Sequence, residues 1–557
     1  MICVTTVGAY AAYSSLGVIF PDGIQNISPS TILDLKEYDD EKLSTYNPPV
    51  QKKMDVLHYL INIDIIPKKE LIQGDVSLKI KLNDQSVDHF VLNFHDNLTI
   101  QKIEVDGVPA KYDQEHELVN IYKPKMTTDS ATVRIVYSGT PKSLGFGSFN
   151  FSISEGTPFI FTMNEPVFAS TWLPCVDTPD DKAMMDIYIT NDSNCVSLSN
   201  GRLIGVISSA GKRTYHWKTF YPISTYLIAI YSGKYKSFSQ KMVSSTRDTI
   251  NLDYYTFNAD FEKAKKDFED HPQYIKVFED IFGPYPFAKE KYSVAEFLWQ
   301  SGAMEHQTIT GIGSNFITGR KFFTDMLIHE LSHHWWGNAV TPKTWKDVWL
   351  NEGFATYSEA LYWEKAAGFA ALQSTLRNKR SSVENGRLYD PGNSLFSSMV
   401  YNKGAWVLHM LRKEVGDTNF FTILKQYFET FKYKNASTFD FKNVCESVCR
   451  RDLTKFFNEW ILKGEGIIKL QYDWTANEKS NETELVLNLE QKQDGYDTYN
   501  FPLDIKIIYT DGSSEIKSTY IKSKAQKISF ALNQKPKEIV LDPDKWLLAE
   551  YELKDNQ

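Results

Sequence analysis

Residues 325–338 read Asp-Met-Leu-Ile-His-Glu-Leu-Ser-His-His-Trp-Trp-Gly-Asn. In a helix, residues four apart lie on one face with Cβ atoms about 5–6 Å apart. The imidazoles of His329 and His333 can therefore converge on one zinc ion, each at a Zn–N distance of about 2.0–2.1 Å. Glu330 then projects beside the metal, where a carboxylate serves as the general base for a water molecule. On this motif alone, a buried helix with two core histidines is the alternative.

A catalytic zinc ion needs a third protein ligand and an open position. The sequence offers Glu352, which lies in the run Trp-Leu-Asn-Glu-Gly-Phe-Ala of residues 349–355, with eighteen residues between it and His333. This interval is long enough for the chain to leave one helix, turn and return on a second. We therefore expect one zinc ion bound by His329, His333 and Glu352. The five cysteines are too few and too irregularly spaced for a Cys-based metal site.

Together these motifs resemble the zinc aminopeptidase N family. These gluzincin aminopeptidases include the membrane alanyl and puromycin-sensitive aminopeptidases, with leukotriene hydrolase as a bifunctional relative. The family also has an upstream G-x-M-E-N motif, and residues 302–306 read Gly-Ala-Met-Glu-His at the matching place. His306 departs from the family's Asn: it could preserve a hydrogen bond made by that Asn, or it could merely fill space. The resemblance covers about residues 50–550.

The resemblance implies roles for further residues. Glu305 and Glu165 would bind the α-ammonium of a peptide with a free N-terminus. Glu165 precedes Trp-Leu-Pro-Cys-Val-Asp-Thr-Pro at residues 172–179, which is similar to the family's F-P-C-x-D-x-P signature. Tyr401, in a Y-x-K-G context, would stabilise the oxyanion. The motif Gly302, Ala303, Met304 would lie along the substrate, with backbone groups of Gly302 and Ala303 pairing with it edge-on as in β-augmentation.

Periodicity predicts a multidomain α+β chain. Polar and apolar side chains alternate in residues 56–65 and 74–82, as in neighbouring antiparallel strands. Helical stretches begin near Phe261. Strand alternation resumes after Gly464, with Asp511-Gly512 as a hairpin turn. We expect a leader and linker (1–50), a β-rich domain (51–240), a mainly helical catalytic domain (241–464) and a β-sandwich (465–557). By resemblance the β-rich domain is saddle-shaped and the catalytic domain thermolysin-like, and the helical fourth domain of many relatives is missing.

Composition narrows the function classes. The chain has 557 residues, of which 42% are hydrophobic, and a net charge of −9. This composition excludes a disordered protein, and the negative charge argues against nucleic acid or an anionic membrane surface as a partner. Residues 1–20 carry no charged side chain, and they fit a leader, a clipped or misassigned signal, or a disordered tail. They do not form a clear membrane-spanning segment. The oligomeric state stays open.

Three other functions are compatible with parts of the pattern. A thermolysin-type endopeptidase would share the zinc and the base but would not need Glu305 and Glu165. An epoxide hydrolase like leukotriene hydrolase is disfavoured because strands replace the helical C-terminal domain of that relative. A non-catalytic scaffold of the same fold would bind no zinc and show no chelator-sensitive activity.

Overall fold

The computed structural model describes residues 47–84, 86–123, 128–144, 147–380, 383, 385–478 and 482–554. The predictions for residues 1–46 lie outside this part of the chain. The chain divides into two compact units. Unit 1 comprises Met1–Trp345 and Phe431–Ala436, and unit 2 comprises Lys346–Thr430 and Ser437–Gln557. The predicted domain boundaries stay a prediction.

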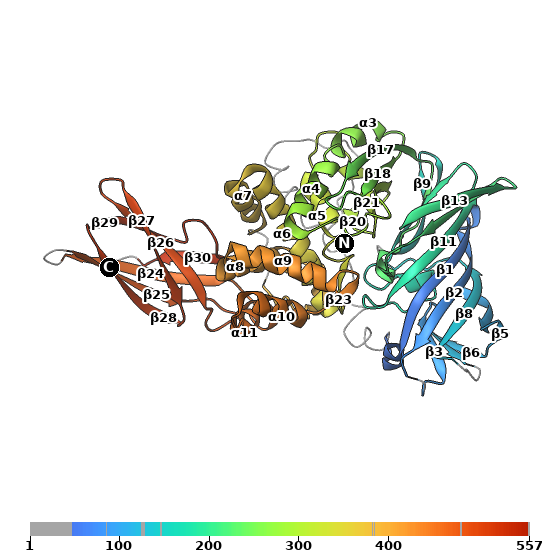
Figure 1. The fold of residues 1–557 in the computed structure, drawn as a ribbon, viewed down its shortest axis with the longest axis horizontal. Helices are drawn as coiled ribbons and strands as arrows, with labels where there is room; N and C mark the ends of the chain where they lie inside the picture. Colours follow the sequence, from blue (N-terminus) through green and yellow to red (C-terminus); the bar gives the residue numbers. More distant parts are fainter. Residues whose placement is uncertain are drawn as a thin grey trace. The chain divides into compact units, whose positions relative to one another are not determined.

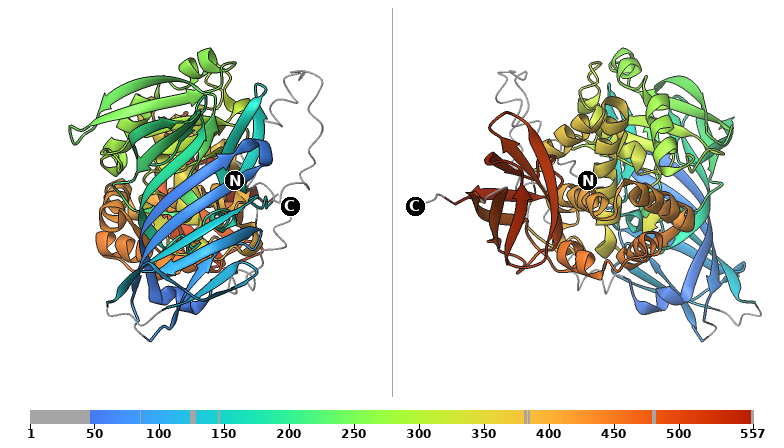
Figure 2. Two further views of the ribbon diagram at one scale, coloured as in Figure 1. Left: turned by 90° about the vertical axis from the view of Figure 1, so that its right-hand side faces the viewer. Right: turned by 60° about the vertical axis from the view of Figure 1, so that its left-hand side comes forward.

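A large, mainly antiparallel sheet begins unit 1 (Figures 1 and 2). The two runs predicted to be neighbouring strands are β1 (Met54–Ile66) and β2 (Leu71–Leu82), and they pair antiparallel as predicted. Alternate side chains of β1 are buried, because one face of the sheet covers the core and the other faces solvent. The remaining strands are β4 (Leu98–Val105), β5 (Val108–Pro109), β8 (Ser130–Gly139), β11 (Lys182–Asp192), β13 (Arg202–Ser209), β14 (Lys212–Lys218) and β15 (Ile223–Ser224).

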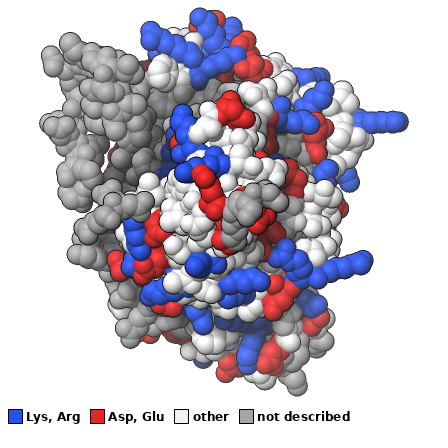
Figure 3. Space-filling model, turned by 90° about the vertical axis from the view of Figure 1, so that its left-hand side faces the viewer, with Lys and Arg blue, Asp and Glu red and all other residues white. Residues whose placement is uncertain are grey.

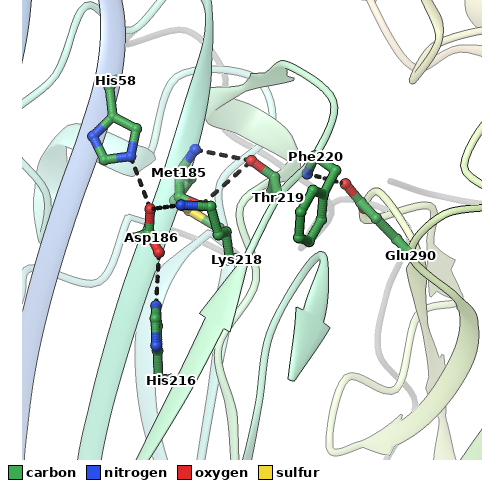
Figure 4. A network of polar contacts seen from close by, with 8 residues as sticks. All are labelled: His58, Met185, Asp186, His216, Lys218, Thr219, Phe220 and Glu290. Atoms are coloured by element: carbon green, nitrogen blue, oxygen red, sulfur yellow. Dashed lines mark hydrogen bonds and ion pairs between the residues drawn. The ribbon is translucent and has the colours of Figure 1, made fainter. Parts of the chain in front are cut away.

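Polar side chains join three strands of this sheet around Asp186 of β11 (Figure 4). One carboxylate oxygen of Asp186 lies 3.0 Å from His58 Nε2 on β1 and 2.9 Å from Lys218 Nζ on β14. The other oxygen lies 2.7 Å from His216 Nε2. The bond between His58 and Asp186 joins residues that are 128 positions apart along the chain. Their strands β1 and β11 pair in parallel, with His58 opposite Met184.

Smaller sheets complete the β-rich part of unit 1. One has the order β12 (Val196–Leu198), β16 (Tyr231–Gly233), β10 (Thr157–Met163), β9 (Ser148–Ser154). Another has the order β3 (His89–Asn93), β7 (Leu118–Tyr122), β6 (Tyr112–Glu115). The residues between β10 and β11 include Glu165 and the Trp172–Pro179 signature.

The predicted catalytic segment starts with a five-stranded sheet, which includes the strand at Ala303 and Met304. Its order is β17 (Lys236–Val243), β18 (Thr249–Thr256), β19 (Tyr292–Phe297), β21 (Ile309–Gly313), β20 (Ala303–Met304). Strands β18, β19 and β21 are parallel, and every residue of β19 is buried, as is typical of a central parallel strand. The helices α3 (Phe261–Asp267), α4 (His271–Phe282) and α5 (Thr324–Ser332) accompany it.

A short segment returns to unit 1 after a long excursion of the chain. Strand β23 (Lys434–Ala436) pairs in parallel with β22 (Val340–Pro342). Just before β23, Tyr433 donates its backbone N–H to Ala339 O over 2.7 Å and its hydroxyl to Pro286 O over 2.6 Å. Its ring stacks on Tyr221, with ring centroids 4.8 Å apart. Unit 1 is therefore completed by residues that follow the whole segment 346–430.

Unit 2 combines helices with a strand-only end. Its helices are α6 (Trp349–Ala367), α7 (Phe369–Arg380), α8 (Gly404–Val415), α9 (Asp417–Phe431), α10 (Thr438–Cys449) and α11 (Thr454–Phe457). One C-terminal sheet has the order β28 (Ala525–Leu532), β25 (Thr483–Gln491), β24 (Ile468–Glu478), β30 (Ala549–Leu553), and the other β27 (Ser514–Ile521), β26 (Phe501–Tyr509), β29 (Pro536–Leu541). Alternate residues of β26 are buried, as in a β-sandwich, and the predicted hairpin at Asp511-Gly512 joins β26 to β27.

The exposed surface of the described part is mixed in charge on the face drawn in Figure 3, where Lys and Arg alternate with Asp and Glu. Among the helices that the structure describes, none combines the length and the apolarity needed to cross a bilayer.

Candidate metal and peptide site

Helix α5 brings together the two histidines that the spacing predicted. The rings of His329 and His333 have centroids 4.8 Å apart and planes at 75°, and both side chains are buried. Each offers a ring nitrogen within 4.8 Å of the other's. The regular part of α5 ends at Ser332, but His333 keeps helical backbone angles as the C-cap, so the four-residue spacing still places both rings on one face.

The tautomer of His333 is fixed by the chain that follows it. Its Nδ1 lies 2.9 Å from the carbonyl oxygen of Trp336, which can only accept a hydrogen bond. Nδ1 therefore carries the proton, and Nε2 presents its lone pair. Metal-binding histidines generally use one nitrogen for the metal and donate the other N–H to such an acceptor. His333 thus fits a divalent metal ion.

Three buried carboxylates of unit 1 lie around these imidazoles. Ligand atoms of Glu305, Glu330 and His333 are all within 4.8 Å of one another, and a carboxylate oxygen of Glu165 lies within 4.8 Å of one of Glu305. All three glutamates have no exposed surface. Buried carboxylates are costly unless cations or hydrogen bonds compensate them. Imidazole nitrogens beside carboxylate oxygens form a donor set that suits zinc, and the remaining carboxylates suit an ammonium group.

The turn that carries Glu305 is tied to the residues after the zinc motif. Glu305 directly follows β20, and its carbonyl oxygen accepts a 2.7 Å hydrogen bond from Asn338 Nδ2. Thr308, with φ +65°, donates its backbone N–H to His334 Nε2 over 3.1 Å. Burial lowers the pKa of His334 to about 3, so this imidazole is neutral and can accept that bond. His334 and Asn338 therefore position the turn, a role that the sequence did not reveal although both lie in residues 325–338.

The other motif residues of this strand are buried too. Ala303 and Met304 pair with Ile312 and Gly311 of β21, and the carbonyl oxygen of Gly302 accepts a 3.0 Å hydrogen bond from Gly313 N. Asn164, next to Glu165, is held by a 2.6 Å bond to the carbonyl oxygen of Ile228. Both glutamates that were predicted to bind the substrate amine thus follow residues that are hydrogen-bonded within unit 1.

Unit 2 contains Glu352 and Tyr401. Glu352 lies in the first turn of α6 and has no exposed surface; Tyr401 is 2% exposed and lies in a π-helical turn, Met399–Lys403, before α8. A Cβ atom placed on Gly353 would lie 2.9 Å from Gly404 Cα, so the two helices touch through glycine backbones. Each glycine stands beside or near a predicted site residue, and this contact sets how α6 and the turn of Tyr401 lie against each other.

Lys403 anchors the same turn. Its ammonium donates hydrogen bonds to the carbonyl oxygens of Gly386 and Gly464 over 2.7 and 2.9 Å. Burial lowers the pKa of Lys403 to about 7. The Y-x-K-G pattern therefore contains an anchoring lysine and a contact glycine around Tyr401.

Comparison with known families matches both parts of the chain. Residues 55–227 match the model of the peptidase M1 N-terminal domain, and residues 266–460 match the model of the peptidase family M1 domain.

Two curated relatives are longer proteins named as aminopeptidases. The chain is 30% identical over 377 residues to leucine aminopeptidase 2 of Yarrowia lipolytica, covering 62% of this chain and 56% of the relative. It is 26% identical over 455 residues to the mitochondrial aminopeptidase 2 of Saccharomyces cerevisiae, covering 75% of this chain and 47% of the relative. The chain thus spans about half the length of these two relatives.

Solved structures share the fold. Aminopeptidase A of Legionella pneumophila, in complex with aspartic acid, has a TM-score of 0.79 at 18% identity, covering 91% of this chain and 60% of that one. The M1 zinc metallopeptidase of Deinococcus radiodurans, in a mutant form bound to a Tyr-Ser-Ala substrate, has a TM-score of 0.65 at 23% identity, covering 74% of this chain and 94% of that one.

Proposed function

The chain belongs to the M1 peptidase family, and on that premise we propose that it is a zinc-dependent aminopeptidase. The observation that carries the proposal is the arrangement in unit 1: two buried imidazoles, with Glu330, Glu305 and Glu165 beside them. An endopeptidase needs the imidazoles and one base, whereas the further buried carboxylates suit a substrate that ends in an ammonium group.

We assign one zinc ion to the ligand set that the sequence motifs predict, His329, His333 and Glu352. The lone pair on His333 Nε2 supports this assignment, as do the burial of Glu352 and its place in the sequence, with eighteen residues between it and His333. When bound, zinc polarises the scissile carbonyl and lowers the pKa of water towards about 7.

Glu330 would act as general base. Its carboxylate has an oxygen within 4.8 Å of a ring nitrogen of His333. Proton transfer by a positioned side chain contributes about 10²–10⁴-fold to a rate. Glu330 would accept the proton of the attacking water and return it to the leaving amine. The Tyr401 hydroxyl would donate a hydrogen bond to the oxyanion that develops on the former carbonyl.

Glu305 and Glu165 would select substrates with a free N-terminus. Each charge-assisted hydrogen bond contributes about 1.5–3 kcal/mol, so two of them favour a free over a blocked terminus by about 10²–10⁴. The backbone of Gly302 and Ala303, next to Met304, would align the substrate as an added strand.

The test compares one peptide in two forms. We expect hydrolysis of an aminoacyl amide or short peptide with a free N-terminus, and at least a hundredfold slower hydrolysis of its N-acetylated form. Equal rates would indicate an endopeptidase. A purified chain with neither zinc nor activity would be the scaffold alternative.

A further inference from the structure

The residue that follows Glu305 is a fully buried histidine with one defined partner. His306 Nδ1 lies 2.7 Å from the hydroxyl oxygen of Tyr231, which belongs to β16. The rings of the two residues contact edge to face, with centroids 5.7 Å apart. A hydrogen bond thus connects the Glu305 turn to a strand of a different sheet.

The neighbouring strand makes room for this bond. Gly311 of β21 pairs with Met304, and a Cβ atom at Gly311 would overlap the Tyr231 hydroxyl. The backbone of Gly311 does not require glycine, because its φ lies outside the left-handed region. Space for the hydroxyl is therefore the physical reason for a glycine at this position.

Both partners of this hydrogen bond are neutral. Burial lowers the pKa of His306 to about 3 and raises that of Tyr231 well above its usual value, so both groups are neutral. The hydroxyl must place its hydrogen on an acceptor, and His306 Nδ1 is its hydrogen-bond partner in the described chain. With the His306 proton on Nε2, Tyr231 is the donor and Nδ1 the acceptor.

We propose that His306 is a positioning residue for Glu305: its hydrogen bond to Tyr231 fixes the turn whose carboxylate binds the substrate's α-ammonium. The inference rests on the proposed aminopeptidase function. Asn338 and His334 hold the turn through hydrogen bonds to backbone groups of Glu305 and Thr308. His306, which lies between these two residues in the sequence, adds a hydrogen bond from its side chain. A binding carboxylate must stay within about 0.5 Å of its productive position, which requires such support.

An asparagine at position 306 could make the same hydrogen bond, whereas a leucine could not. The Oδ1 of an asparagine is two bonds from Cβ, as Nδ1 of histidine is, and it can accept the same hydrogen bond. A leucine fills similar space but cannot accept. His306→Asn and His306→Leu therefore separate hydrogen bonding from space filling.

Steady-state kinetics on an aminoacyl amide test the proposal. Loss of one hydrogen bond between neutral groups corresponds to about a threefold to tenfold loss in binding. We expect His306→Leu, Tyr231→Phe and Gly311→Ala each to raise KM by that factor with kcat changed less than twofold. His306→Asn should stay within twofold of the wild type in both constants.

Tyr357→Phe is the matched control. Tyr357 and His409 form a buried pair of the same chemistry in unit 2, with the hydroxyl 3.1 Å from Nδ1. Its removal should lower the unfolding midpoint but leave KM unchanged. A similar rise of KM in this control, an unchanged KM in His306→Leu, or a fall of kcat with constant KM would each overturn the positioning role.

Calorimetric binding of an amino-acid amide, with its N-acetyl derivative as reference, separates the two levels of inference. A wild-type chain that neither binds the free amine nor hydrolyses the substrate contradicts the proposed function itself. A wild-type chain that does both, with His306→Leu binding the amine equally well, contradicts only the role of His306.

Discussion

The contact between Gly353 and Gly404 leads to a sharp prediction for Gly353→Ala. The added Cβ would lie 2.9 Å from Gly404 Cα and 3.1 Å from Gly404 C, whereas ordinary contacts begin near 3.4 Å. Backbone atoms cannot rotate away, so α6 and the start of α8 must separate by roughly 0.5 Å at this point. Glu352, the residue before Gly353, must move with the helix.

Two opposing terms set the change in stability. Overpacking of this kind costs about 1–3 kcal/mol, while replacing a glycine inside a helix by alanine stabilises by about 1 kcal/mol. We expect a net loss of about 0–2 kcal/mol in the free energy of unfolding. Activity should respond more strongly, because misplacement of catalytic groups by about 1 Å can cost about 10²-fold.

The assay measures bound zinc, kcat/KM and the thermal midpoint in parallel. Gly353→Ala should lower kcat/KM by about 10- to 100-fold, and Gly404→Ala should behave alike because its Cβ would lie 2.8 Å from Gly353 Cα. Gly205→Ala is the control, since nothing lies within 4 Å of its added Cβ on the exposed strand β13. Full zinc content and kcat/KM within twofold of the wild type in Gly353→Ala would refute the reasoning.

Three further predictions address the proposed chemistry. Glu330→Gln should retain zinc but lower kcat by about 10²–10⁴-fold, whereas Glu352→Gln should lose zinc. Metal analysis and steady-state kinetics on both variants test this. A Glu330→Gln chain with full activity would show that Glu330 is not the base. A chelator should abolish hydrolysis and lower the thermal midpoint, and added zinc should restore both. The midpoint should fall because a ligand that binds only the folded state stabilises it. Unchanged activity in the metal-free chain would contradict zinc catalysis. Burial lowers the pKa of Lys403 from 10.5 in the unfolded chain to about 7 in the folded protein. Between these two pH values the unfolded chain binds more protons, so the free energy of unfolding rises with pH by up to about 1.4 kcal/mol per pH unit. Lys403→Met should lack this rise in urea titrations between pH 7 and 10, and identical slopes in both chains would contradict a depressed pKa.

Local patterns in the sequence predicted those features that depend on nearby residues. The alternation in residues 56–65 and 74–82 sufficed for the antiparallel pair β1 and β2, because a short turn joins them. The four-residue spacing of His329 and His333 sufficed for the adjacent imidazoles, because helix geometry is fixed.

Features that depend on distant partners could not be predicted in this way. Nothing local to β1 indicates that β11 is its parallel neighbour. Gly353 by itself indicates only a weak helix position, and its meaning depends on Gly404 some fifty residues later. The acceptor role of His334 likewise requires the position of Thr308, which follows from the five-stranded sheet.

The return of residues 431–436 to unit 1 has a consequence for synthesis on the ribosome. The nascent chain must emerge through the whole segment 346–430 before Tyr433 and β23 can reach their sites beside Tyr221 and Ala339. At about 5–20 residues per second this delay is roughly 5–20 s. During that time unit 1 lacks its last strand, β23. The native packing of unit 1 is therefore completed only after residues 346–430, which belong to unit 2, have been synthesised.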